Sequence, residues 1–205
     1  MKILIAVPTM DMVAAGFAQS LATLNKIGEC SVAFQVGSLI YDSRNKLATT
    51  AISMEAEYVL WFDSDMIFEP NTLVKLMKDL DEGRDIVSGL YFRRAAPYTP
   101  VAFSKLEING DDSVHEDYDG ELTGIHEVGG VGFGCVLMKS EVLIDLFSRY
   151  GTCFSPIGGF GEDLSFCWRA RESGYKIHLD ADVKCGHVGH ILVTQDFHDA
   201  YRKEK

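Results

Sequence analysis

Two carboxylates one residue apart, Asp63 and Asp65, have the type and spacing that can bind a metal ion. They follow the apolar run YVLWF at residues 58–62, which is typical of a buried strand. Side chains at positions i and i+2 of an extended chain point the same way, so both can face one ligand. Like charges this close repel unless a cation lies beside them, and carboxylate oxygens suit Mg²⁺ or Mn²⁺. The same pair could instead end the strand and cap the turn or helix that follows.

A second acidic pair, Glu162 and Asp163, stands where the Gly-rich segment GGFG leads into a helical pattern. The helix dipole favours acidic residues in the first turn, which explains one of the pair. The glycines before them favour a backbone that comes close to a ligand.

Two histidines follow in KCGHVGH, His187 between glycines and His190 beyond. An imidazole ligand favours Mn²⁺ over Mg²⁺, although a lone histidine is commonly an ordinary hydrogen-bonded residue.

The composition limits the classes of partner. The chain has 205 residues, with 19 Lys and Arg against 30 Asp and Glu, a formal net charge of −11. A chain this acidic should repel nucleic acid and anionic membranes, so we expect neither as a partner. The five cysteines are widely spaced without a CxxC pair, which indicates reduced thiols in a cytoplasmic protein. We expect no transmembrane segment and no signal peptide.

Alternating strands and helices must position these residues. Strand patterns at 2–8, 30–40, 58–62 and 85–92 alternate with helical patterns at 12–28, 43–57 and 70–83. After residue 93 come an acidic loop or hairpin tip (107–121), a short strand and helix (129–147), a helix (161–174) and a strand (175–185). This order predicts a single α/β domain over 1–205, with a mainly parallel, Rossmann-like sheet flanked by helices and an irregular second half.

Parallel α/β sheets bind ligands at the carboxyl ends of their strands, where Asp63 and Asp65 are expected. Arg93 and Arg94 follow the fourth strand and should reach the same edge, where they could bind phosphate or an acidic acceptor. A solvated basic pair in an acidic protein is the alternative. The glycines of GGVGFGC do not form the GxGxxG of a dinucleotide-binding loop, because residue 135 is Cys.

Four segments, in this order along the chain, resemble the GT-A-type glycosyltransferases of family 2 and their relatives. ILIAVPT resembles the opening strand and Pro-Thr turn, and SRNKLATTAISMEAEYVLWFDSDMIFEPNTL the Arg-Asn helix, third strand and D-x-D motif. GEDLSFCWRARESGYKI resembles the Glu-Asp helix near the acceptor site, and GHVG the late histidine of the metal shell. The resemblance implies one GT-A-like domain with a nucleotide-binding half at 1–93 and an acceptor-binding half at 94–205.

The activity that this resemblance implies is metal-dependent transfer of a sugar from a UDP- or GDP-sugar to a hydroxyl acceptor, whether saccharide, lipid-linked or other. Asp65 and His187 would hold the metal, Mn²⁺ or Mg²⁺, and Asp63 would approach the ribose or a metal-bound water. The other residues implied to bind the nucleotide or donor are Pro8, Thr9, Arg44, Asn45 and Ser64. The family's usual base-reading Asp after the second strand has no clean match, so the base stays open.

The resemblance also implies roles on the acceptor side. Asp163 would be the general base that takes the proton of the acceptor hydroxyl if the reaction inverts the anomeric centre; in a retaining enzyme it would bind the acceptor instead. Glu162 would orient the acceptor or support its loop. Gly132 and Gly134 would let the backbone approach the sugar or acceptor.

Two other functions share these features. A nucleotidyltransferase of the same architecture also needs carboxylates and a metal, but VPTMDMVAAG after the first strand carries no basic residue, which counts against it. A non-catalytic nucleotide-sugar-binding relative would keep the pocket without turnover, and residue types alone cannot separate it from an enzyme. The sugar, the acceptor, the stereochemistry and the oligomeric state stay open, and an oligomer is compatible with the sequence.

Overall fold

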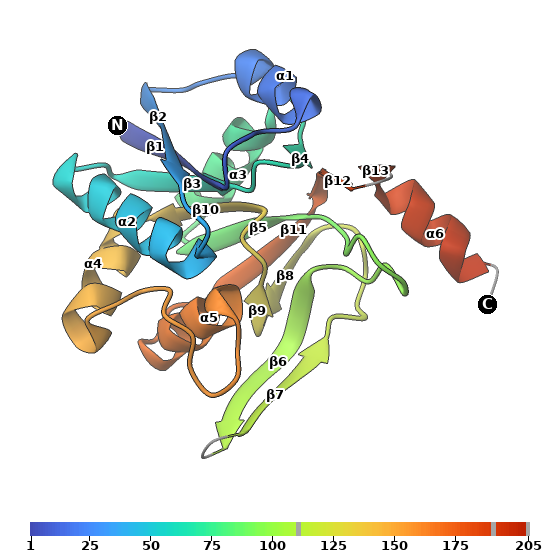
Figure 1. The fold of residues 1–205 in the computed structure, drawn as a ribbon. Coiled ribbons are helices and arrows are strands. Elements are labelled where there is room, and N and C mark those ends of the chain that lie inside the picture. Colours follow the sequence, from blue (N-terminus) through green and yellow to red (C-terminus); the bar gives the residue numbers. More distant parts are fainter. Residues whose placement is uncertain (110–111, 190–191, 204–205) are drawn as a thin grey trace.

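A seven-stranded sheet forms the centre of the computed structural model, which describes residues 1–109, 112–189 and 192–203 (Figure 1). Its strand order is β2 (Glu29–Val36), β1 (Lys2–Thr9), β3 (Tyr58–Phe62), β10 (Cys135–Lys139), β5 (Ile86–Leu90), β11 (Ile177–Lys184) and β8 (Ile125–Val128). Five of these strands run in one direction, whereas β10 and β8 are antiparallel to their neighbours. The expected fold class, a mixed α/β domain with a largely parallel sheet flanked by helices, is confirmed. The antiparallel β10 in its middle is not what the sequence predicted.

Hydrophobic side chains alternate between the two faces of the sheet, as strand β3 illustrates. Val59 and Trp61 pack on one face, whereas Leu60 and Phe62 pack on the other. Helices α2 (Ile40–Ser53), α4 (Ser140–Tyr150) and α5 (Glu162–Glu172) cover the first face, and α1 (Ala15–Thr23) and α3 (Thr72–Asp81) cover the second. Each large apolar side chain that this three-layer arrangement removes from water contributes about 1.5–3 kcal/mol.

The regular elements of the first half are found with shifted ends. Strand β2 is shorter than the expected 30–40, because Ile40 already begins α2. Helix α1 covers only part of the expected 12–28, and Gly28, at φ +64°, turns the chain toward β2 instead of ending the helix. Helix α3 begins two residues after Pro70 and is followed, as expected, by Gly83 at φ +94°.

Two small sheets and a last helix complete the second half. Strands β6 (Ala102–Asn109) and β7 (Asp112–Asp117) form a hairpin that pairs with β9 (Gly130–Val131). The acidic segment, expected as a loop or hairpin tip, thus supplies β7 and the end of β6. Strands β4 (Met66–Ile67), β12 (Gly186–Val188) and β13 (Leu192–Val193) form the other sheet, and helix α6 (Gln195–Lys203) follows. No helix of the described ranges is long and apolar enough to cross a membrane.

Two carboxyl groups meet between helix α3 and strand β11. Asp79 and Asp180 are 5% and 7% exposed, and Asp79 Oδ2 is buried without a hydrogen-bond partner in the described part of the chain. Burial and the neighbouring Asp180 raise the pKa of Asp79 to about 7. Two carboxyl groups can bond each other only when one of them holds a proton, so at neutral pH this contact strains the fold.

We predict that Asp79→Asn makes the protein more stable at pH 8 by about 1–3 kcal/mol, because an amide supplies a donor and removes a buried charge. The raised pKa means that the wild type loses stability as the pH rises from about 4, the ordinary carboxyl value, toward 7. Urea denaturation at pH 4.5 and pH 8 measures the difference, which should shrink at the lower pH. Asp81→Asn, an exposed position on the same helix, is the control, and equal stabilisation by both variants would contradict the explanation.

Candidate functional site

A cleft of about 780 Å³ opens at the carboxyl ends of β1, β3 and β5. This is the edge at which parallel α/β sheets bind their ligands. Most of the residues singled out in the sequence line it, namely Pro8, Thr9, Arg44, Asp63, Ser64, Asp65, Arg93, Arg94, Glu162, Asp163 and His187. They come from strand ends, from two helices and from β12, so the fold gathers segments that are far apart in the sequence.

Arg44 lies at the centre of the acidic groups. Its side chain projects from α2 and is 2% exposed. Its Nη2 donates to Asp63 Oδ1 at 2.9 Å, and its Nε lies 3.3 Å from Asp163 Oδ1 and 3.6 Å from Glu162 Oε1. The guanidinium also lies over the ring of Phe133, 5.2 Å from its centroid. One buried cation therefore joins the carboxylate after β3 to the two that begin α5.

The same cluster shifts two pKa values. Burial alone lowers the pKa of Arg44, but Asp163, Asp63 and Glu162 more than offset it, so the pKa is raised and the charge is kept. Burial raises the pKa of Asp163 to about 7; Arg44 opposes this rise, while Glu162 and Asp63 add to it. The Phe133 N–H donates to Asp163 Oδ2 at 3.2 Å and fixes the carboxyl group in the cleft. A carboxyl group with this pKa can both accept and release a proton near neutral pH.

Asp65 and His187 face each other beside this cluster. Strand β12 pairs with β4, and the Val188 N–H donates to the Asp65 carbonyl at 2.8 Å. His187 Nε2 lies 3.6 Å from Asp65 Oδ1, and Arg94 Nη1 donates to Asp65 Oδ2 at 2.8 Å. Burial raises the pKa of Asp65, but His187 and Arg94 lower it by more, so it stays below its ordinary value.

The arrangement of Asp65 and His187 fits a divalent metal. His187 Nδ1 lies 2.9 Å from the Phe92 carbonyl, which can only accept, so Nδ1 carries the proton and Nε2, which would offer its lone pair to a metal in a neutral ring, faces the carboxylate. Two atoms each about 2.1 Å from one ion lie about 3–4 Å apart, which matches the observed separation. The described residues contain no group of three or more His, Cys, Asp or Glu side chains placed to bind a metal, so water or substrate oxygens would complete the shell.

Asn45 does not line the cleft. Its Oδ1 accepts hydrogen bonds from Thr152 Oγ1 and from the backbone N–H groups of Cys153 and Phe154, at 3.0–3.2 Å. The residue therefore holds the segment before α5 and lies away from the donor site implied for it. His190, the second histidine of the sequence motif, falls outside the described residues.

Gly132 and Gly134 make room for Tyr91, not for a ligand at the cleft surface. A Cβ on Gly134 would lie 2.7 Å from Tyr91 Cζ, and one on Gly132 would overlap the Tyr91 hydroxyl. That hydroxyl accepts from the Gly134 N–H at 3.1 Å, and the ring lines the cleft. Sequence reasoning missed Tyr91 because it placed the residue inside the expected strand 85–92; in the structure β5 ends at Leu90, so Tyr91 directly follows it at the binding edge.

Arg93 and Arg94 diverge from each other. Arg94 reaches Asp65, whereas Arg93 Nη2 donates to Asp117 Oδ1 at 2.7 Å and lies over the ring of Phe103. Only Arg94 is therefore placed beside the Asp65 carboxylate, and Arg93 joins the cleft to the end of β7.

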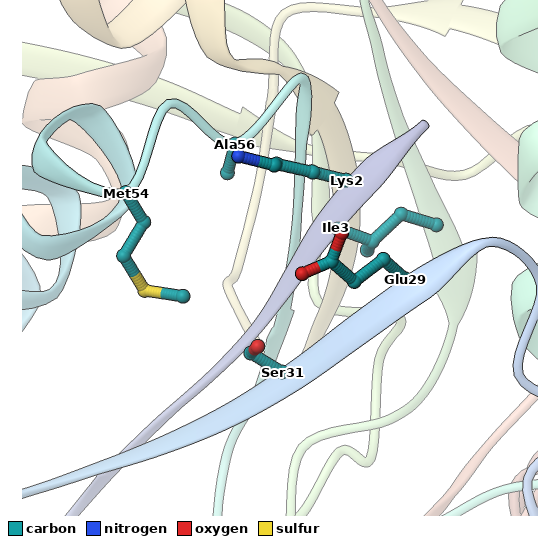
Figure 2. A pocket seen from close by; sticks show the side chains of 6 residues that line it. All are labelled: Lys2, Ile3, Glu29, Ser31, Met54 and Ala56. Carbon is teal, nitrogen blue, oxygen red and sulfur yellow. The ribbon is translucent and has the colours of Figure 1, made fainter.

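A smaller pocket of about 220 Å³ lies at the opposite edge of the sheet (Figure 2). Lys2, Glu29 and Met54 are among its lining residues, at the amino ends of β1 and β2 and the end of α2. It contains none of the residues singled out in the sequence. The large cleft is therefore the candidate functional site.

We predict that Arg44→Met lowers the free energy of unfolding by about 3–5 kcal/mol, because three carboxylates lose the cation that compensates them. Arg44→Lys keeps the charge but not the planar fork, so its loss should be smaller. Urea denaturation measures both. Lys46→Met, two residues along the same helix at an exposed ion pair with Asp42, is the control and should change stability by at most about 0.5 kcal/mol. A loss for Arg44→Met no larger than that of the control would contradict this account.

No family model matches the chain, and no curated protein matches it in sequence. Its fold is similar to the crystal structure of A197 from STIV, with a TM-score of 0.71 and 20% identity, covering 95% of this chain and 94% of that one. It is also similar to S. aureus TarS 1–349 in complex with UDP-GlcNAc, with a TM-score of 0.57 and 17% identity, covering 89% of this chain and 56% of that one. These likenesses support the glycosyltransferase-like fold expected from the sequence, and at such identities they show the fold alone.

Proposed function

We propose that this protein is a metal-dependent glycosyltransferase that moves a sugar from a UDP- or GDP-sugar to a hydroxyl acceptor. The observation that carries the proposal is the pair of contacts that Arg44 makes in one cleft: a hydrogen-bonded ion pair with Asp63 on the donor side and an ion pair with Asp163 on the acceptor side. The similarity of the fold to TarS in complex with UDP-GlcNAc supports a nucleotide sugar as the donor.

The donor would lie across the carboxyl ends of β1 and β3. Pro8 and Thr9 offer a wall for the base, and Thr9 Oγ1 is held by a hydrogen bond to the Met12 carbonyl at 2.6 Å. Arg94 would bind the diphosphate as a cation, since its guanidinium already lies beside a carboxylate in the same place. Asp63 would accept from the ribose hydroxyls or from a water. Because the protein as a whole is acidic, an anionic donor needs a local positive charge such as that of Arg94.

Asp65 and His187 would hold Mn²⁺ or Mg²⁺. When bound, the ion would neutralise both phosphates and the negative charge that develops as the nucleoside diphosphate leaves. The Phe92 carbonyl keeps the His187 ring in the orientation and tautomer that metal binding requires.

Asp163 would take the proton from the acceptor hydroxyl while that oxygen forms a bond to the anomeric carbon and the diphosphate departs with the bonding electrons. The Phe133 N–H and Arg44 hold the carboxyl group in place, and its pKa of about 7 suits a base. Glu162 would orient the acceptor and keep the pKa of Asp163 high. Attack from the side opposite the leaving group gives inversion of the anomeric centre.

We predict that one nucleoside diphosphate or its sugar raises the thermal midpoint only with Mn²⁺. A ligand at a hundred times its dissociation constant adds about 2.7 kcal/mol, which corresponds to about 5–10 °C for a chain of this size. The panel is UDP, GDP, CDP and their common sugars, with and without Mn²⁺, on wild type, Asp65→Asn and the surface control Asp145→Asn. Loss of the shift in Asp65→Asn alone supports the metal-bridged donor site. A shift of equal size without Mn²⁺ and in Asp65→Asn would overturn the metal-bridged donor site.

We predict that Asp163→Asn lowers turnover by at least about 100-fold while donor binding is kept, because a general base contributes about 10²–10⁴. For wild type, kcat/KM should rise with pH through about 7 and then level off, since the base acts as a carboxylate. Glu162→Gln should move this rise to lower pH, because the neighbouring negative charge that raises the pKa is gone. Donor binding without any sugar transfer would instead favour a non-catalytic relative, and release of pyrophosphate from a nucleoside triphosphate would favour a nucleotidyltransferase.

A further inference from the structure

Besides the cleft and the small pocket near Lys2, a pocket of about 430 Å³ lies where the loop that carries Arg93 and Arg94 continues into residues 97–100. Its walls are the loop 97–100, the segment 117–119 at and after the end of β7, and three residues of helix α6, namely His198, Tyr201 and Arg202. Its volume falls within the range of about 300–1,000 Å³ that small-molecule sites occupy. None of the residues predicted from the sequence lies in it.

The three walls are fixed to one another by specific contacts. Asp117 accepts from Arg93 at 2.7 Å and from Thr99 Oγ1 at 3.4 Å. The Tyr98 ring packs edge-on against Phe197 and Tyr201, with centroids 4.7 and 5.0 Å apart. A pocket whose walls are joined in this way is formed before a ligand enters, which lowers the entropic cost of binding.

A buried polar atom marks the pocket wall. His198 is 2% exposed, its ring stacks on Phe92, and its Nδ1 is bonded to the Tyr98 carbonyl. Its Nε2 has no hydrogen-bond partner among the residues that the structure describes. A buried nitrogen left without a partner is costly, and because Nε2 has almost no accessible surface, a small movement of this wall would be needed for a bound hydroxyl group to supply the missing hydrogen bond.

The other lining groups match a neutral sugar. Tyrosine rings offer amphipathic faces on which the C–H groups of a pyranose can pack. Asp119 and Arg202 are exposed at the rim and offer an acceptor and a donor for ring hydroxyls. The carboxylates of Asp117 and Asp119 oppose a phosphate or a uronic acid, and the charged rim disfavours a lipid chain.

The loop that carries Arg93 and Arg94 separates the pocket from the cleft and, with its continuation to Val101, contributes residues to both. Arg93 lines the cleft and binds Asp117, which lines the pocket. On the other side Pro100 lines the pocket, the next residue Val101 lines the cleft, and the Val101 carbonyl accepts from the Gly132 N–H. The following N–H, that of Phe133, holds Asp163. A saccharide that crosses this loop at Val101 would extend from the pocket toward the residues that hold the base.

We infer that this pocket binds a neutral hexose residue of an oligosaccharide acceptor, whose next residue presents its hydroxyl to Asp163. Only the role of the saccharide as an acceptor rests on the proposed function, because binding in the pocket does not require turnover. It names the acceptor as a saccharide with at least two residues, because pocket and cleft are separate sites on either side of the Arg93 loop.

Saturation-transfer difference NMR tests this with defined probes: the methyl glycosides of glucose, galactose, mannose and N-acetylglucosamine, the disaccharides cellobiose, lactose, mannobiose and chitobiose, and glucuronic acid. Spectra are recorded on the full chain with saturating UDP and Mn²⁺, and on Asp119→Asn and Arg202→Gln. Both substitutions are at exposed positions and should fold. Arg149→Gln, an exposed arginine paired with Asp145 on α4, is the matched control.

We expect at least one neutral disaccharide to show saturation transfer, more strongly than its monosaccharide, and the signal to fall at least threefold in Asp119→Asn and Arg202→Gln but not in Arg149→Gln. Absence of signal for every neutral probe, equal signal in all variants, or a preference for glucuronic acid would each overturn the inference. The thermal shift caused by the nucleotide distinguishes failure of this inference from failure of the proposed function. A shift without saccharide binding leaves the proposed function standing, and saccharide binding without any nucleotide shift leaves a sugar pocket but removes the transferase.

Discussion

One guanidinium, buried among three carboxylates, sets the geometry of the candidate site. Arg44 projects from α2, Asp63 follows β3, and Glu162 and Asp163 begin α5, so one charge holds three elements that are distant in sequence. The arginine can be buried only because carboxylates surround it, and the carboxylates can lie close only because the arginine is between them. The site cannot relax without leaving a buried charge unpaired. The stability of the fold and the arrangement of the carboxyl groups in the cleft therefore rest on the same contacts.

Around this cluster the cleft gives two carboxyl groups opposite properties. The pKa of Asp65 is held low beside His187 and Arg94, which keeps the group charged and ready to bind a cation. The pKa of Asp163 is raised by burial and by its acidic neighbours, which prepares the group to exchange a proton. Two carboxyl groups whose environments shift their pKa values in opposite directions can serve different chemical roles in one site.

Local rules in the sequence accounted for the order of strands and helices in the first half and for the place of Asp63 and Asp65 after β3, although several element ends are shifted. The resemblance placed Asn45 with Arg44 at the nucleotide, but neighbouring residues on a helix point about 100° apart, and Arg44 takes the direction toward the cleft. The glycines at 132 and 134 showed that something approaches the backbone closely, but not that it is Tyr91. Periodicity also carries no information on which strands pair, so the antiparallel strand within a largely parallel sheet had to come from the structure.

Strand β10 lies between β3 and β5 although it follows both of them in the sequence. Until its residues have been synthesised, the facing edges of those two strands have no partner and are open to wrong pairing. Pairs between such distant segments give a high contact order, which slows folding because long loops must close first. A chain divided near residue 93 would leave both strands without their common neighbour. Strand β10 thus joins the two halves that the resemblance implies into one sheet, and it lies next to β3, at whose end Asp63 and Asp65 line the cleft.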